Sequence, residues 1–371
     1  MIAVASRGMG EAEHIALATG TLSVTVHEAG WPLDELCGFA ARNNPKRGFL
    51  VVSKMLGRHW PARPSAIRAT AAALAARIPA DLPGPVLVVG LAETAICLGQ
   101  TVHEELRVLT GRDDFLFIHS TRQQIDHPLL CRFEEAHSHA TAHLIYWPAL
   151  PGFTPPRSLV LVDDEVSTGA TFRRAAAALT SSWPGIETIC LATLTDWSED
   201  GWQARMPRPA ISVSLLRGRL DWRAAPVDAT PVAAPGALGL LPVAAQNFGR
   251  LGLQEPVATP PANMPAPPSR PLRIVGTGEF TYLPFRLAER LEQAGTDVVM
   301  QATSRSPVRI GGAITSALNF ADNYRTGVPN FLYNADRLDG RATWICHETG
   351  APSIDPALIQ ALDAELVGWV A

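Results

Sequence analysis

The stretch Val160-Leu161-Val162-Asp163-Asp164-Glu165-Val166-Ser167-Thr168-Gly169-Ala170-Thr171 carries the strongest structural signal in the chain. Residues 158–162 lack polar alternation, as a strand buried on both faces does, and residues 172–179 have an alanine-rich helical pattern. The polar turn between them is therefore predicted to lie at a helix N-terminus, where free backbone N–H groups bind anions. This order of elements predicts a phosphate site.

The side chains of this turn suit a sugar that carries a phosphate. Gly169 lets the backbone approach a ligand closely. Three hydroxyl side chains can donate hydrogen bonds, those of Ser167, Thr168 and Thr171. Adjacent carboxylates would repel a phosphate unless they face sugar hydroxyls or a divalent cation. We therefore expect Asp163 and Asp164 to face a ribose and a magnesium diphosphate.

These residues resemble the motif with which type I phosphoribosyltransferases bind 5-phosphoribosyl 1-diphosphate (PRPP). The motif is an apolar strand, two acids, two variable residues, two hydroxyl residues, glycine, any residue and threonine, and every position is filled. The resemblance implies a doubly wound parallel α/β sheet, catalysis with Mg²⁺, and catalytic and metal-ordering roles for Asp163 and Asp164. The positions that it assigns to PRPP are Asp163, Asp164, Glu165, Val166, Ser167, Thr168, Gly169, Ala170 and Thr171.

Other segments predict the alternation of strands and helices that this fold requires. Buried strands are expected at 86–90, 115–119, 159–162 and 188–193, with helices at 66–77 and 95–109. A turn of small residues follows the first of these strands. We expect it to hold diphosphate through Leu91, Ala92, Glu93 and Thr94. The alternative is that its small residues only let the helix pack closely on the strand.

Residues 120–147 lie where the resembling fold carries a mobile catalytic loop. We expect Arg122 and His137 to neutralise departing diphosphate and to move a proton. A solvated loop is one alternative, and a zinc site formed by His137, His139 and His143 is another. Lys54, at the end of a predicted strand in a basic segment, is a further catalytic candidate, although a lysine in such a place is commonly solvated.

A proline-rich stretch divides the chain. We expect an N-terminal extension at 1–25, a phosphoribosyltransferase domain at 26–253, a linker at 254–271 and a C-terminal domain at 272–371. Every element assigned to PRPP precedes the linker, so residues 1–253 are expected to fold and bind PRPP alone. The C-terminal part predicts a strand, glycine turn, helix and second strand. Its Gly276-x-Gly278 lacks the third glycine of a dinucleotide site.

Residues 45–59, 90–100 and 134–143, together with the PRPP motif, resemble phosphoribosyltransferases of bacterial tellurium-resistance and stress-associated gene clusters. Those proteins have a C-terminal domain named for a Thr-Arg-Ser-Pro (TRSP) signature, which here reads Ser304-Arg305-Ser306-Pro307. The resemblance implies a nucleotide-like biosynthetic pathway with an open acceptor. Ser304, Arg305 and Ser306 would suit a phosphate or carboxylate, unless Arg305 only pairs with an acid to hold the turn.

Composition sets limits on the function classes. The 371 residues are 47% hydrophobic and 18% charged with a net charge of −4, which predicts two globular domains and no stable nucleic-acid or membrane binding. Five cysteines without a Cys-x-x-Cys pair favour the cytoplasm over a disulfide framework. The expected partners are PRPP and a small-molecule acceptor, with a homodimer possible. A PRPP-sensing regulator and a scaffold with a vestigial site are the alternatives.

Overall fold

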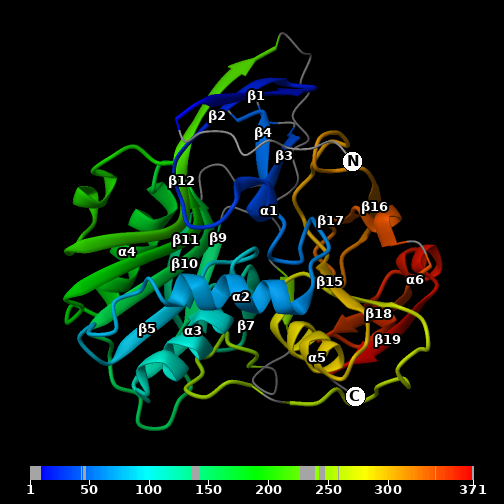
Figure 1. The fold of residues 1–371 in the computed structure, drawn as a ribbon. Helices are drawn as coiled ribbons and strands as arrows, with labels where there is room; N and C mark the ends of the chain where they lie inside the picture. Colours follow the sequence, from blue (N-terminus) through cyan, green and yellow to red (C-terminus); the bar gives the residue numbers. More distant parts are fainter. Residues whose placement is uncertain are drawn as a thin grey trace.

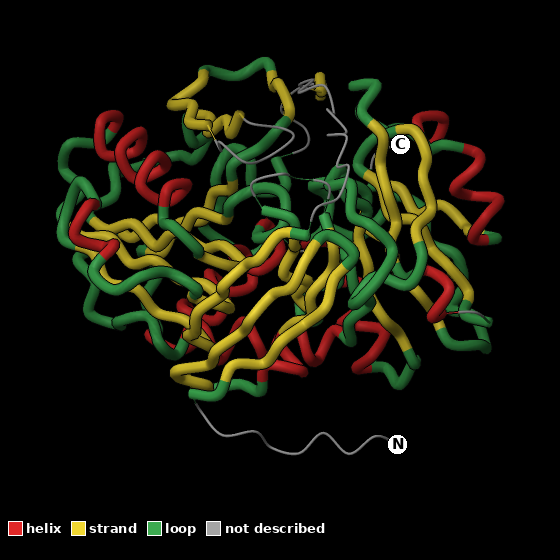
Figure 2. The backbone as a smooth tube through the Cα atoms, turned by 90° about the horizontal axis from the view of Figure 1, so that it is seen from above, coloured by secondary structure: helices red, strands yellow, loops and turns green. Residues whose placement is uncertain are grey.

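Two β-sheets organise the protein, one in each half of the chain, and they lie side by side (Figures 1 and 2). The computed structural model describes residues 10–42, 44, 47–134, 142–225, 239–241, 247–257, 259–338 and 340–369. Among these, no helix is long and apolar enough to cross a membrane.

The first sheet has seven strands in the order β1-β2-β12-β11-β10-β5-β6. From β12 to β6 neighbouring strands are parallel, whereas β1 and β2 are antiparallel additions at one edge. The strands are β1 (Ala12–Leu17), β2 (Gly20–Ala29), β5 (Val86–Gly90), β6 (Phe115–His119), β10 (Ser158–Val166), β11 (Thr188–Asp196) and β12 (Ala210–Ala224). β5 and β10 are neighbours although β6 lies between them in the chain, so the direction of winding reverses between β5 and β10.

Helices cover both faces of this sheet. On one face α2 (Pro64–Ala75) and α3 (Ile96–Thr110) pack on the strands, and on the other lies α4 (Ala170–Ser182) (Figure 1). Along β5, Val86 and Val88 belong to the first core, and Leu87 and Val89 belong to the second. A strand buried on both faces needs this continuous apolar sequence. The predicted doubly wound parallel sheet is confirmed.

Two expectations about the first sheet need correction. Strand β10 does not end at Val162, because its ladder with β11 continues to Val166↔Asp196, and the motif acids are therefore strand residues. The expected extension at 1–25 is also wrong as a boundary. It cuts through β2, whose pairing with β12 runs from Gly20 to Ala29 and holds this segment in the sheet.

The second sheet has four parallel strands in the order β15-β14-β18-β19. They are β14 (Leu272–Gly276), β15 (Val298–Ala302), β18 (Ala342–His347) and β19 (Ala364–Gly368), with helices α5 (Tyr282–Gln293) and α6 (Pro356–Leu362). The predicted strand, glycine turn, helix and strand correspond to β14, α5 and β15. The proline-rich segment is tied to this sheet, since Trp369 Nε1 donates to Thr259 O at 2.8 Å and Ala262 N donates to Gly368 O at 2.8 Å.

Short elements surround the two sheets. They are α1 (Leu33–Leu36), the hairpin β3 (Cys37–Ala41) and β4 (Phe49–Ser53), the pair β8 (Leu129–Glu134) and β9 (Ala142–Tyr146), the parallel pair β7 (Gln123–Ile125) and β13 (Gly239–Leu241), the hairpin β16 (Ala317–Ala321) and β17 (Pro329–Tyr333), and the 3₁₀ turns η1 (Trp202–Arg205), η2 (Ala335–Leu338) and η3 (Ala351–Ser353). Isolated bridges from Ala62 to Met300 and from Arg42 to Val308 join the two halves of the chain.

A buried ionic cluster joins the two domains. Both terminal nitrogens of Arg250 donate to the Glu348 carboxylate at 2.6 Å, and Arg250 Nη2 also donates to Glu279 at 3.0 Å. Glu279 accepts from the Thr121 hydroxyl and from the backbone N of Arg122, both at 2.5 Å. All three charged side chains are at most 1% exposed. The predicted independence of residues 1–253 stays a prediction, and this cluster weighs against it because truncation would remove both carboxylates.

We predict that Arg250→Met lowers the free energy of unfolding by about 3–5 kcal/mol, because it leaves two buried carboxylates without their cation. Denaturant unfolding of the full chain measures the change. Arg290→Met is the control, since Arg290 is exposed on α5 and its loss should change stability by less than about 0.5 kcal/mol. Equal stabilities of the two variants would contradict a structural role for the cluster.

Candidate active site

A pocket of about 210 Å³ opens at the carboxyl ends of β5 and β10, where the winding of the first sheet reverses. Open α/β sheets bind their ligands at this place. Many sequence-predicted residues line it together: Ala92, Glu93, Thr94, Arg122, the whole run from Asp163 to Thr171, and Ser304, Arg305 and Ser306. Two loops of the first domain and one turn of the second therefore share a single cavity.

The turn between β10 and α4 places the N-terminus of a 13-residue helix at the pocket. Gly169 is the N-cap residue and has φ of +68°, a conformation that residues with a Cβ rarely adopt. A Cβ at this position would also lie 2.0 Å from a ring carbon of Trp202. Trp202 stacks on Phe172, in the first turn of α4, and so holds the start of the helix in place. The helix dipole and N–H groups favour an anion there.

Three consecutive carboxylates precede this turn. Asp163 Oδ1 accepts from the backbone N of Asp164 at 3.0 Å, and Glu165 pairs with Arg47 at 2.6 Å. Burial, with the negative charge of Glu165, raises the pKa of Asp164 to about 7. Asp164 therefore exchanges its proton near neutral pH, and a cation or a hydroxyl donor would stabilise its charged form.

The acids fit a magnesium ion that the substrate helps to hold. Mg²⁺ keeps several waters and takes one or two carboxylates together with substrate phosphates. Asp163 and Asp164 bring such carboxylates to the pocket. In the part of the chain that the structure describes, no cluster of three or more histidine, cysteine or carboxylate side chains could hold a metal unaided. His143 lines the pocket, whereas His137 and His139 lie outside the described residues, so the zinc alternative stays untested.

The loop after β5 is held from two sides. Ala92 N donates to Ser120 Oγ at 2.9 Å, and Arg122 Nη2 donates to Ala92 O at 3.3 Å. On the other side Arg58 donates to Glu93 O at 2.9 Å. The Ala92–Glu93 peptide bond is cis. These contacts fix the backbone that the sequence assigned to diphosphate.

Two predicted residues, Leu91 and Lys54, do not line the described pocket. Leu91 is 1% exposed and packs in the core around α4 rather than lining the cavity. Lys54 does not line it either, because its Nζ donates to Asp34 O at 2.5 Å and lies 5.2 Å from the centre of the Trp60 ring. His137 lies outside the described residues.

Sequence reasoning missed His59 and Arg174, which both line the pocket. Burial, with the charges of Arg58 and Arg42, lowers the pKa of His59 to about 3, so its imidazole is neutral at pH 7. His59 Nε2 lies 3.2 Å from Ser304 Oγ, on the second domain. The pair of His59 and Ser304 forms only in the tertiary structure. The one local sequence signal for His59 was its place in the basic segment that also supplies Arg42 and Arg47 to the pocket.

Comparisons with known proteins agree with this geometry. Residues 36–219 match the profile of a family described as phosphoribosyl transferase, and residues 255–362 match a TRSP domain described as C-terminal to that family's domain. A search of curated protein sequences finds no significant match.

Several solved structures are similar to the first domain. Adenine phosphoribosyltransferase from Rhodothermus marinus is 17% identical with a TM-score of 0.32, over 49% of this chain and 95% of its own. The Giardia lamblia enzyme complexed with 9-deazaadenine is 16% identical with a TM-score of 0.35, over 51% and 98%. Orotate phosphoribosyltransferase from Aeropyrum pernix is 17% identical with a TM-score of 0.27, over 45% and 79%. Values this low say nothing about the substrate.

The two matches identify a phosphoribosyltransferase domain at residues 36–219, followed by a TRSP domain at residues 255–362. One expectation about the site requires correction. Ser304, Arg305 and Ser306 do not form a separate site in the second domain, because they line the same cavity as the PRPP motif. The expectation that every PRPP-binding element precedes residue 254 stays a prediction, and the shared cavity weighs against it.

We predict that Asp164→Asn flattens the pH dependence of stability. The pKa of Asp164 is raised from 3.8 to about 7, so between these pH values the folded chain binds a proton that the unfolded chain has released. The free energy of unfolding of the parent then falls as pH rises through this window, by up to about 1.4 kcal/mol per pH unit for one proton. The variant should lack this component in denaturant unfolding.

The control for this experiment is Asp81→Asn, which changes an exposed carboxylate. It should retain the parent's pH profile. An Asp164→Asn profile parallel to that of the parent from pH 4 to pH 7 would show that Asp164 does not titrate in this range.

Proposed function

We propose that the protein transfers the 5-phosphoribosyl group of PRPP to a base-like acceptor, with release of diphosphate and with Mg²⁺ as cofactor. The observation that carries the proposal is the convergence of the β10–α4 turn, Asp163 and Asp164, and the loop at residues 92–94 in one pocket. The turn suits the 5-phosphate of PRPP, the two aspartates suit its ribose hydroxyls, and the loop suits its diphosphate. A stress-associated nucleotide-like pathway belongs to the same proposal and is supported by the sequence resemblance alone.

In this proposal the chain acts mainly by positioning and by charge. The N-terminus of α4 binds the 5-phosphate, and the two aspartates accept hydrogen bonds from the ribose hydroxyls. Mg²⁺, when bound, neutralises charge on the diphosphate and makes it a better leaving group. Departure of diphosphate leaves positive charge at the anomeric carbon, which the carboxylates of Asp163 and Asp164 stabilise from nearby.

Arg122 has a positioning role. Its guanidinium donates to Ala142 O at 2.9 Å and to Ala92 O at 3.3 Å, and the side chain is 3% exposed. It thereby links the loop after β5 to the start of β9. Charge on this side chain also lowers the cost of bringing an anionic leaving group into the pocket.

PRPP binding can be tested before the acceptor is known. A ligand that binds only the folded chain stabilises it by about 2.7 kcal/mol at one hundred times its dissociation constant. A rise in Tm with PRPP and Mg²⁺ is therefore expected. Incubation with PRPP, Mg²⁺ and a small-molecule cell extract, followed by mass detection of a phosphoribosyl adduct, then identifies the acceptor.

We predict that the double variant Asp163→Asn, Asp164→Asn lowers turnover by roughly 100-fold or more while it remains folded, because ligand contacts and charge stabilisation are lost together. Diphosphate release in the presence of the identified acceptor measures the rate. Asp81→Asn again serves as the matched control. A double variant with parental turnover and parental PRPP affinity would rule out the assignment of these acids.

A further inference from the structure

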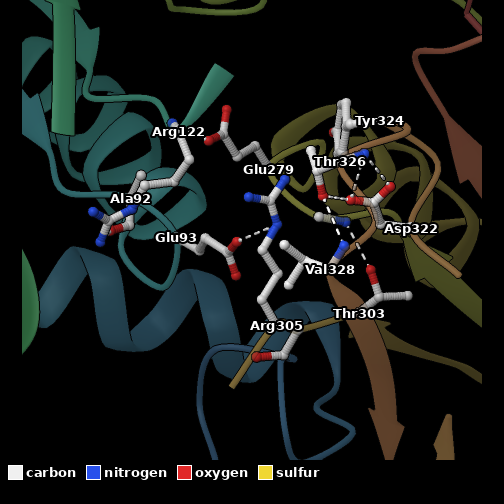
Figure 3. Close-up of polar contacts among 12 residues, drawn as sticks. Ala92, Glu93, Arg122, Glu279, Thr303, Arg305, Asp322, Tyr324, Thr326 and Val328 are labelled. Carbon is white, nitrogen blue, oxygen red and sulfur yellow. Dashed lines mark hydrogen bonds and ion pairs between the residues drawn. The ribbon is translucent and has the colours of Figure 1, made fainter. Parts of the chain in front are cut away.

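Arg305 comes from the second domain but belongs to the cavity of the first. It follows β15 in the Ser-Arg-Ser-Pro turn, is 5% exposed, and lines the pocket with Ala92, Glu93 and Asp164. Figure 3 shows its guanidinium beside the Glu93 carboxylate, with Ala92 and Arg122 beyond. The loop after β5 is therefore its immediate neighbour.

The contacts of Arg305 leave part of its guanidinium unused. Its Nε lies 3.4 Å from Glu93 Oε1, and its Cζ lies 5.9 Å from the centre of the Tyr324 ring. Nη1 and Nη2 are buried and have no hydrogen-bond partner among the described residues. The alternative that Arg305 only pairs with an acid therefore accounts for Nε alone among the three guanidinium nitrogens.

The free nitrogens indicate an anionic ligand. A guanidinium keeps its charge at every relevant pH, and burying its donors without partners is costly. Glu93 does not remove this cost, because its carboxylate is shared with Arg58 at 3.4 Å. Two parallel N–H donors match a phosphate or a carboxylate in a bidentate geometry.

The turn that carries Arg305 is held in place. Ser304 Oγ contacts His59 Nε2 at 3.2 Å and accepts from Ser306 N at 3.2 Å. The backbone of Ser304 also exchanges hydrogen bonds with Phe331. Arg305 is therefore presented to the pocket by a fixed backbone, as a preorganised binding residue requires.

We propose that Arg305 binds the diphosphate group of PRPP, so that the TRSP domain completes the phosphoribosyl site. This inference rests on the proposed function. The diphosphate is favoured over the 5-phosphate because Arg305 contacts Glu93 in the loop after β5, whereas the 5-phosphate site is the turn after β10. Arg122 holds the same loop through Ala92 O. The leaving group then lies against both domains.

The test measures binding of three probes to the full chain by calorimetry with excess Mg²⁺: inorganic diphosphate, PRPP and ribose 5-phosphate. Arg305→Met should lower the affinity for diphosphate and for PRPP by roughly 10-fold or more, because both carry the group that Arg305 binds. It should lower the affinity for ribose 5-phosphate, which lacks this group, by less than about twofold. Arg305→Lys retains the charge without the fork and should fall between Met and the parent. Arg290→Met, which changes an exposed arginine on α5, should match the parent.

Each outcome has a distinct meaning. Parental diphosphate and PRPP affinity in Arg305→Met would overturn the inference while leaving the proposed function intact. An equal loss for all three probes would also overturn it, since it would indicate damage to the whole pocket. Failure of the parent to bind PRPP or ribose 5-phosphate would contradict the proposed function itself.

Discussion

The guanidinium of Arg58 is the contact on which the shared pocket depends. It donates to Thr303 O at 2.6 Å and to Gly278 O at 2.8 Å, both in the second domain, and to Glu93 O at 2.9 Å in the first. Burial lowers the pKa of Arg58, while Glu93 and Glu279 oppose that shift. Because Thr303 leads directly into the Ser-Arg-Ser-Pro turn, the Arg58 side chain connects the start of that turn to the loop after β5.

A second domain fixed in this way contributes Ser304, Arg305 and Ser306 to the cavity that the PRPP motif lines. The Arg250 cluster supports the same arrangement of the two domains. Glu279 accepts a hydrogen bond from the backbone of Arg122, and Glu348 accepts hydrogen bonds from Arg250 and from Tyr324. Tyr324 in turn lies beside Arg305. Buried charges of opposite sign are costly to separate, so the two domains are held in one relative position.

Local patterns in the sequence predicted what local interactions determine. The bounds of β5 and β6 and the glycine turn into α4 follow from apolar runs and from the conformational freedom of Gly169. What could not be predicted is made by contacts between distant segments. Strand β2 pairs with β12 almost two hundred residues later in the chain, and no periodicity in the sequence reveals this partner. The contact of Arg305 with Glu93 also joins segments that are distant in sequence. The sequence likewise does not show that Lys54 contacts Asp34 and Trp60 instead of lining the pocket.

We propose that both domains bind PRPP at once, and a crystal structure of the full chain with PRPP and Mg²⁺ would show whether they do. We expect the 5-phosphate at the N-terminus of α4 and the diphosphate between residues 92–94 and Arg305, with both terminal nitrogens of Arg305 at hydrogen-bond distance from diphosphate oxygens. A bound PRPP whose contacts all come from residues before the proline-rich segment, with Arg305 turned away from it, would contradict this proposal.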